Sequence, residues 1–129
     1  MAVSFPTTEM NVLLLYDLNP DWTPHEKEEV AQAHVRLSDA LLSAGFSIDL
    51  LPVVDQHFPE RLSSYDSQDC VLFNWCDGIP GLHHSEYLVV RHLEQLGFVF
   101  TGSGSATLAL SYDKHRVKQI LDRQSVPTP

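Results

Sequence analysis

Residues 10–17, MNVLLLYD, most constrain what this chain can fold into. The segment has a continuous apolar centre, without the apolar–polar alternation of a strand that has one face in water. An uninterrupted run of this length is typical of a strand buried on both faces of a parallel sheet. It therefore predicts a parallel sheet that is covered by helices on both sides.

The segment after this strand carries the signals of a long amphipathic helix. Thr23 can cap the helix, Pro24 suits its first position, and Glu26 can complete a capping box. Gly45 stands where a left-handed helix end favours glycine. The apolar stripe between these ends consists of Val30, Ala33, Leu37, Leu41 and Ala44.

The same alternation continues to the end of the chain. We expect strands at residues 46–53, 69–75 and 98–101, a short helix near 59–64, and a helix that Ser85 caps and Gly97 ends. Strands that alternate with helices predict the α/β class: a Rossmann-like parallel sheet with helices on both faces, joined by right-handed crossovers. We expect one domain over residues 1–125, with 126–129 as the start of a linker.

Composition excludes some functions. A chain of 129 residues with a formal charge of -9 and only eight Lys and Arg lacks the clustered positive charge that nucleic acids and anionic membranes require. The N-terminus has no basic leader, and the run Val12–Leu15 is too short for a signal core or a membrane span, so we expect a cytoplasmic protein. Cys70 and Cys76 have neither zinc-ligand spacing nor the pattern of a disulfide framework.

Ligands of open parallel sheets bind at the carboxyl ends of the strands. We therefore expect chemistry in the loops at residues 17–25, 75–86 and 101–105. The candidate substrate-contacting residues in or beside these loops are Asp17, Asn74, Asp77, Glu86, Gly102 and Ser103. Asn and Asp are also ordinary turn residues. His83 and His84 are ligand types for metals, but their spacing from Glu86 and from each other is not that of a metal site, and we expect none.

Residues 101–114, TGSGSATLALSYDK, allow two interpretations. The segment lacks the third glycine of a dinucleotide-binding fingerprint, and it is not a P-loop. The glycines can turn a corner, with Ser103 or Ser105 capping a short helix at 106–110, or free amides there can hold an anion. Asp113 can cap a second helix, whose first turn contains Lys114. A lysine there opposes the helix dipole unless an anion or a carboxylate lies nearby.

These motifs together resemble those of D-alanine:D-alanine ligases and their ATP-grasp relatives. The shared features are a helix ending in LE-x-LG, then TGS, AL-x-x-DK, K-x-x-L and VPTP, all within residues 69–129. The first strand–helix–strand unit matches only in outline. The resemblance implies the Rossmann-like domain that precedes the ATP-grasp subdomains, and hence a bacterial, cytoplasmic ligase domain that is inactive alone.

The family resemblance also implies partners and roles. Such ligases phosphorylate a carboxylate with ATP so that an amine can attack the acyl phosphate, and the later subdomains hold most of the ATP and magnesium. Lys114 matches the DK lysine that reaches the ATP phosphates. The implied partners are ATP and a small amino-acid or carboxylate substrate, with a homodimer through this domain.

Two loops depart from the family pattern and leave the substrate open. Residues 16–20, YDLNP, replace a Gly-Gly turn, and NWCDGIPGLHHSE replaces HG-x-x-GEDG. The family glutamate that meets the first substrate's amino group can correspond to Glu26, Glu28 or Glu29. Catalytic residues stay unassigned. The alternative is a stand-alone flavodoxin- or receiver-like binding module, although a receiver would end its third strand with Asp rather than Asn74.

Overall fold

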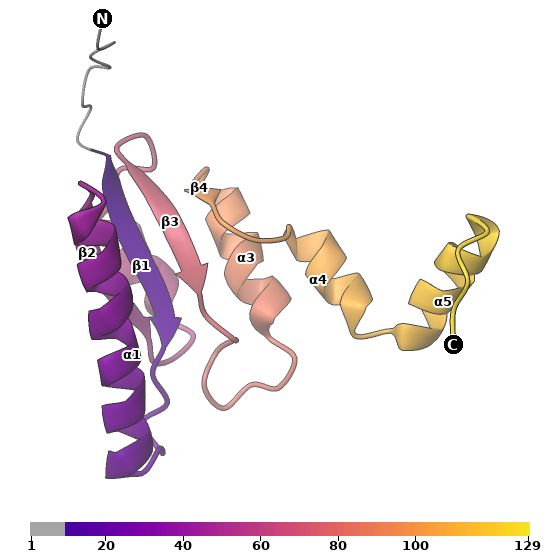
Figure 1. Cartoon of the computed structure of the whole chain (residues 1–129), viewed down its shortest axis with the longest axis horizontal. Helices are drawn as coiled ribbons and strands as arrows, with labels where there is room; N and C mark the ends of the chain where they lie inside the picture. Colours follow the sequence, from indigo (N-terminus) through magenta and orange to yellow (C-terminus); the bar gives the residue numbers. More distant parts are fainter. Residues whose placement is uncertain (1–9) are drawn as a thin grey trace, which may run out of the picture.

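The computed structural model describes residues 10–129 and confirms the α/β class (Figure 1). Within these residues, four strands form one parallel sheet in the order β2-β1-β3-β4, and the chain forms five helices. The elements along the chain are β1 (Asn11–Asp17), α1 (Pro24–Ser43), β2 (Ser47–Val53), α2 (Phe58–Leu62), β3 (Cys70–Trp75), α3 (Glu86–Gln95), β4 (Val99–Phe100), α4 (Ser105–Ser111) and α5 (Lys114–Arg123).

Strand β1 is buried as its sequence predicts. It pairs in parallel with β2 on one side and with β3 on the other, so that Leu13 lies opposite both Asp49 and Leu72. Leu13, Leu14 and Leu15 are all fully buried. An apolar run without alternation fits this position because both faces of β1 are covered.

Helices cover both faces of the sheet (Figure 1). On the first face, β1 packs against α1, where the ring of Tyr16 contacts that of His34. On the opposite face, Leu13 and Leu15 join the main hydrophobic core with α2 and α3. That core also contains Leu51, Val53, Phe58, Leu62, Cys70, Leu72, Ile79, Val89, Leu93 and Phe98.

The ends of α1 follow the predicted chemistry. The Thr23 hydroxyl accepts a hydrogen bond from the Glu26 amide, and the Glu26 carboxylate accepts one from the Thr23 amide at 2.7 Å. Gly45 follows the helix with φ +92°, the left-handed conformation that the sequence suggests.

The expected cap of α3 is only half right. Ser85 occupies the capping position, but its side chain makes no capping hydrogen bond to the helix. Its hydroxyl instead accepts from the Ile79 amide at 2.7 Å and donates to the Leu82 carbonyl at 2.6 Å. Ser85 therefore fixes the loop before the helix, because the loop amide is buried and needs an acceptor.

The start of α4 differs from the expectation. Gly104, not Ser103 or Ser105, is the N-terminal capping residue, and Ser105 is the first residue of the helix. The reason is a long-range contact, since the Glu94 carboxylate binds both the amide and the hydroxyl of Ser105. The cap of α5 is confirmed, because the Asp113 side chain accepts from the Arg116 amide at 3.0 Å.

Helices α4 and α5 extend away from the sheet beyond α3 (Figure 1). Helix α4 packs on α3, and α5 packs on α4. Within residues 10–129, none of the helices combines the length and apolar character that crossing a membrane requires.

Candidate functional site

A pocket of about 200 Å³ lies at the carboxyl edge of the sheet. Its walls come from the end of β3, the loop that follows, the first turn of α3 and the turn between β4 and α4. The lining residues are Asn74, Cys76, Asp77, Glu86, Thr101, Gly102, Ser103 and Leu108. This is the edge at which open parallel sheets bind their ligands.

The structure brings together all six substrate-contacting candidates. Five of them line the pocket, and the sixth, Asp17, is hydrogen-bonded to one of these five. The Asp17 carboxylate accepts a hydrogen bond from the Asp77 amide at 3.1 Å, which joins the end of β1 to the loop after β3. The sequence therefore located the pocket, while the roles of its residues stay predictions.

Asn74 lines the pocket and has a buried acceptor without a partner in the described residues. Its backbone amide donates to the Thr101 hydroxyl at 3.0 Å, which holds the end of β3 against the segment after β4. Its side-chain oxygen Oδ1 is buried and has no hydrogen-bond partner within residues 10–129. Buried polar atoms are nearly always paired, so an orphaned acceptor beside a pocket marks a place for a donor.

Negative charge dominates the pocket. Asp77 and Glu86 line it, Asp17 adjoins it, and no Lys or Arg is among its lining residues. Partial burial, followed by the charges of Asp17 and Glu86, raises the pKa of Asp77. Over residues 10–129, no three His, Cys, Asp or Glu side chains are grouped to hold a metal ion. The pocket therefore suits a cationic hydrogen-bond donor, such as an ammonium group.

Cys76 lies in this pocket but is unsuited to nucleophilic chemistry. Its thiol donates to the Gly78 carbonyl at 3.2 Å, and burial raises its pKa to about 12. The thiolate is the reactive form of cysteine, and it is scarce at neutral pH when the pKa is this high.

Tyr112 is a site neighbour that sequence reasoning missed. Its hydroxyl donates to the Glu86 carboxylate, and its ring contacts that of His84 at a centroid distance of 4.6 Å. Partial burial and the adjacent Glu86 raise the pKa of Tyr112 to about 12, so the hydroxyl keeps its proton. Leu108 was also missed, and Thr101 was not named individually although it lies in the loop expected at residues 101–105. No local pattern links Tyr112 or Leu108 to the loop after β3.

Lys114 lies outside the acidic pocket. It lines a separate groove of about 330 Å³ between α5 and the segment that follows it. The other lining residues are Ser111, Val117, Lys118, Leu121, Thr128 and Pro129. None of the ion pairs formed within residues 10–129 includes Lys114. Its ammonium group is therefore available at the start of α5, two residues after Tyr112.

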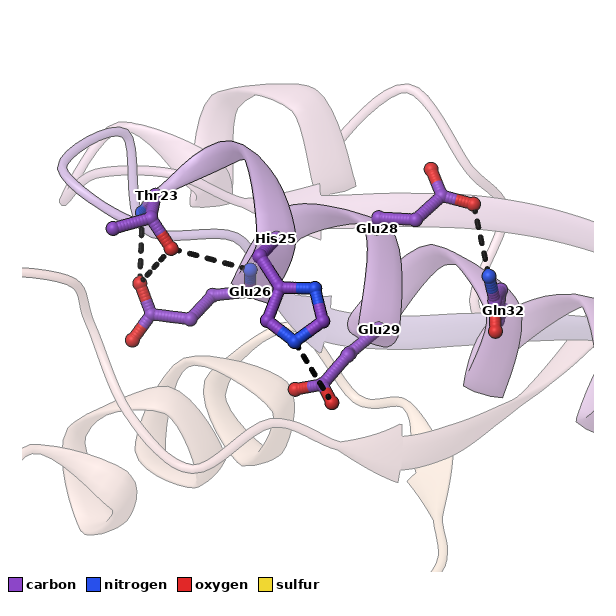
Figure 2. A network of polar contacts seen from close by, with 6 residues as sticks. All are labelled: Thr23, His25, Glu26, Glu28, Glu29 and Gln32. Carbon is purple, nitrogen blue, oxygen red and sulfur yellow. Dashed lines mark hydrogen bonds and ion pairs between the residues drawn. The ribbon is translucent and has the colours of Figure 1, made fainter.

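The three glutamates at the start of α1 have local partners (Figure 2). Glu26 completes the capping box, Glu28 accepts from the Gln32 side chain at 3.0 Å, and Glu29 lies 3.5 Å from the His25 ring. Each therefore has a role within the helix. Glu86, by contrast, lies at the pocket.

The fold and the pocket define an α/β domain of Rossmann-like architecture with an acidic pocket at the carboxyl edge of its parallel sheet. A stretch of 104 residues is 30% identical to a D-alanine--D-alanine ligase of Sphingopyxis alaskensis, and it covers 81% of this chain and 32% of that ligase. The chain thus spans about a third of the length of this curated relative. No family model and no solved structure matches the chain.

Proposed function

We propose that this chain is the N-terminal, substrate- and phosphate-contacting domain of an ATP-dependent carboxylate–amine ligase. The observation that carries the proposal is the similarity to a D-alanine--D-alanine ligase over most of the chain. The acidic pocket at the carboxyl edge of the sheet supports it independently. Residues 126–129 lead into the part of the ligase that holds most of the nucleotide, and the domain is inactive without that part.

The acidic pocket binds the ammonium group of an amino-acid substrate. Asp77, Glu86 and the Oδ1 atom of Asn74 are acceptors around a small volume, and an ammonium group supplies three donors. Burial is the largest cause of the raised pKa of Asp77, and the charges of Asp17 and Glu86 add to it; the charge of the ammonium offsets this second contribution. The substrate class is therefore a small amino acid, which enters with its amino group toward the sheet.

Lys114 contacts the phosphates of ATP. In the proposed reaction the γ-phosphoryl group passes to a substrate carboxylate, and an amine then displaces phosphate from the acyl phosphate. A lysine ammonium beside the transferring group stabilises its negative charge. The magnesium ligands belong to the later subdomains of the ligase, as the resemblance to the ATP-grasp family implies.

The test uses the full-length protein that contains this chain. We expect ATP-dependent phosphate release with one member of a panel of small amino acids, and we expect Lys114→Ala to weaken ATP binding about tenfold, through loss of a charge-assisted contact. Arg123→Ala is the matched control, because it removes a positive charge from the exposed end of the same helix. Equal ATP affinity in wild type and Lys114→Ala would refute the phosphate role.

A further inference from the structure

Two carboxylates of α3 hold the two ends of α4. Near the C-terminal end of α3, the Glu94 oxygens accept from the Ser105 amide at 2.8 Å and from the Ser105 hydroxyl at 2.6 Å. At the first residue of α3, Glu86 accepts from the Tyr112 hydroxyl at the end of α4. The two helices are therefore antiparallel and are joined at both ends by hydrogen bonds to charged acceptors.

These contacts matter because α4 has little apolar anchorage. None of the residues of α4 or α5 is fully buried. Helix α4 packs on α3, and α5, which begins with Lys114, packs on α4. The position of Lys114 relative to the sheet therefore depends on how α4 is held.

The turn before α4 leaves room for the Glu94 carboxylate. A Cβ atom on Gly104 would lie 3.2 Å from the Glu94 Oε1 atom, so glycine gives the carboxylate room to approach. The side-chain and backbone hydrogen bonds from Ser105 lower the pKa of Glu94, which keeps the carboxylate ionised and able to accept both bonds. Glu94 thereby occupies the amide at the start of α4 that an external anion would otherwise bind.

We propose that Glu94 is a positioning residue, which orients α4 through Ser105 and thereby places Lys114 relative to the acidic pocket, with the Glu86–Tyr112 bond as the second point of attachment. Only the consequence for ATP rests on the proposed function. The orientation itself is a property of this chain and can be measured without any ligand.

Residual dipolar couplings of the backbone amides test the orientation in the 129-residue chain. In wild type, one alignment tensor should fit the couplings of β1, β3 and α5 together. In Glu94→Ala we expect α5 to lose this common alignment, and the Ser105 amide to exchange with solvent several-fold faster. Glu94→Gln should restore both readouts, because its amide group can accept from one Ser105 group and donate to the other.

Gln95→Ala, at the adjacent exposed position of α3, is the control and should leave the alignment unchanged. Unchanged sheet couplings in every variant would show that the fold is intact. A common alignment that survives in Glu94→Ala and in a Glu94→Ala/Tyr112→Phe double variant would overturn the proposal.

The catalytic consequence is measured separately in the full-length protein. We expect Glu94→Ala to raise the KM for ATP more than it lowers kcat, and Glu94→Gln to restore the KM. If Lys114→Ala leaves ATP affinity unchanged, the proposed phosphate role fails, whereas a loss of alignment in Glu94→Ala would still support the positioning role.

Discussion

His34 is a titratable residue of α1 whose ring packs against the sheet. Its ring centroid lies 3.8 Å from that of Tyr16 and 5.3 Å from that of Trp75, and the residue is only 8% exposed. Burial lowers the pKa of His34 below 6.5, and the nearby Asp17 opposes this shift only in part. The neutral imidazole is therefore the form that fits the folded state.

We predict that acidification destabilises the fold through His34. Well above pH 6.5 the ring is neutral in both the folded and the unfolded states, so it contributes no pH dependence. As the pH falls from 6.5 toward the folded-state pKa, the unfolded state takes up the proton first, and the free energy of unfolding decreases. Urea unfolding across this pH range measures the free energy of unfolding, which should change less with pH in His34→Gln than in wild type. His83→Gln, at an exposed position, should keep the wild-type slope.

Asp77 gives a second prediction for the pH dependence of stability, in the opposite direction to that of His34. Its folded-state pKa is raised above 3.8, so ionisation costs stability as the pH rises from 3.8 through the folded pKa. We expect Asp77→Asn to raise the melting temperature at neutral pH, because it removes the cost of a partly buried carboxylate and its repulsion by Asp17 and Glu86. Asp39→Asn on the exposed surface of α1 should have little effect. A lower melting temperature for Asp77→Asn would contradict the repulsion argument. Under the proposed function, the same variant loses affinity for the amino acid.

Three helices end with the same hydrogen-bond pattern, although the sequence differs at one of them. The amides of Phe46, Phe98 and Val126 each donate to the carbonyl five residues earlier, as in a Schellman motif. Glycine precedes the first two with positive φ. In the third, Ser125 takes the place of glycine with φ +57°, and a non-glycine residue is strained in this left-handed conformation.

Replacing Ser125 with glycine should therefore stabilise the end of α5. We expect Ser125→Gly to increase the free energy of unfolding by about 0.5–1 kcal/mol, because it removes the clash of Cβ with the carbonyl. Ser43→Gly, within α1, should lower it by about 0.5–1 kcal/mol, since glycine there only adds entropy to the unfolded state. Chemical denaturation followed by circular dichroism measures both changes. Destabilisation by Ser125→Gly would rule out strain at this position.

The elements that the sequence predicts correctly depend on local chemistry. The apolar run of β1, the Thr23–Glu26 capping box and the glycines after α1 and α3 each act within a few residues, so a single segment reveals them. The errors have a different cause. Ser85 bonds its own loop, and Ser105 is bound by Glu94, a residue eleven positions earlier.

The candidate site also has one part that the sequence predicts and another that depends on tertiary packing. Parallel strands bring their carboxyl ends to one edge, so the topology alone places Asn74, Asp77 and Ser103 together. Tyr112 joins Glu86 across 26 positions, and this bond depends on how α4 lies against α3. Tertiary packing of this kind leaves no periodic signal in the sequence.

At the scale of the whole molecule, the buried residues lie in the sheet and in the helices packed on it, whereas the last two helices contain none. Three consecutive leucines of β1 are fully buried, whereas α5 has no buried residue and packs on α4 rather than on the sheet (Figure 1). We predict that amides of α5 exchange with solvent by local opening, while those of β1 exchange only by global unfolding. Native-state hydrogen exchange in low denaturant separates the two. Equal opening free energies for α5 and β1 would show that the domain unfolds as one unit.

The central place of β1 has a consequence for how the protein is made. Among the four strands of the sheet it leaves the ribosome first, yet its two partners, β2 and β3, are synthesised only after long intervening segments. Until Cys70–Trp75 has emerged, one edge of β1 is unpaired and one face of its three leucines is uncovered. Both are then exposed to other chains. A nascent chain that stalls before β3 should therefore be the form most prone to aggregate and most dependent on chaperones.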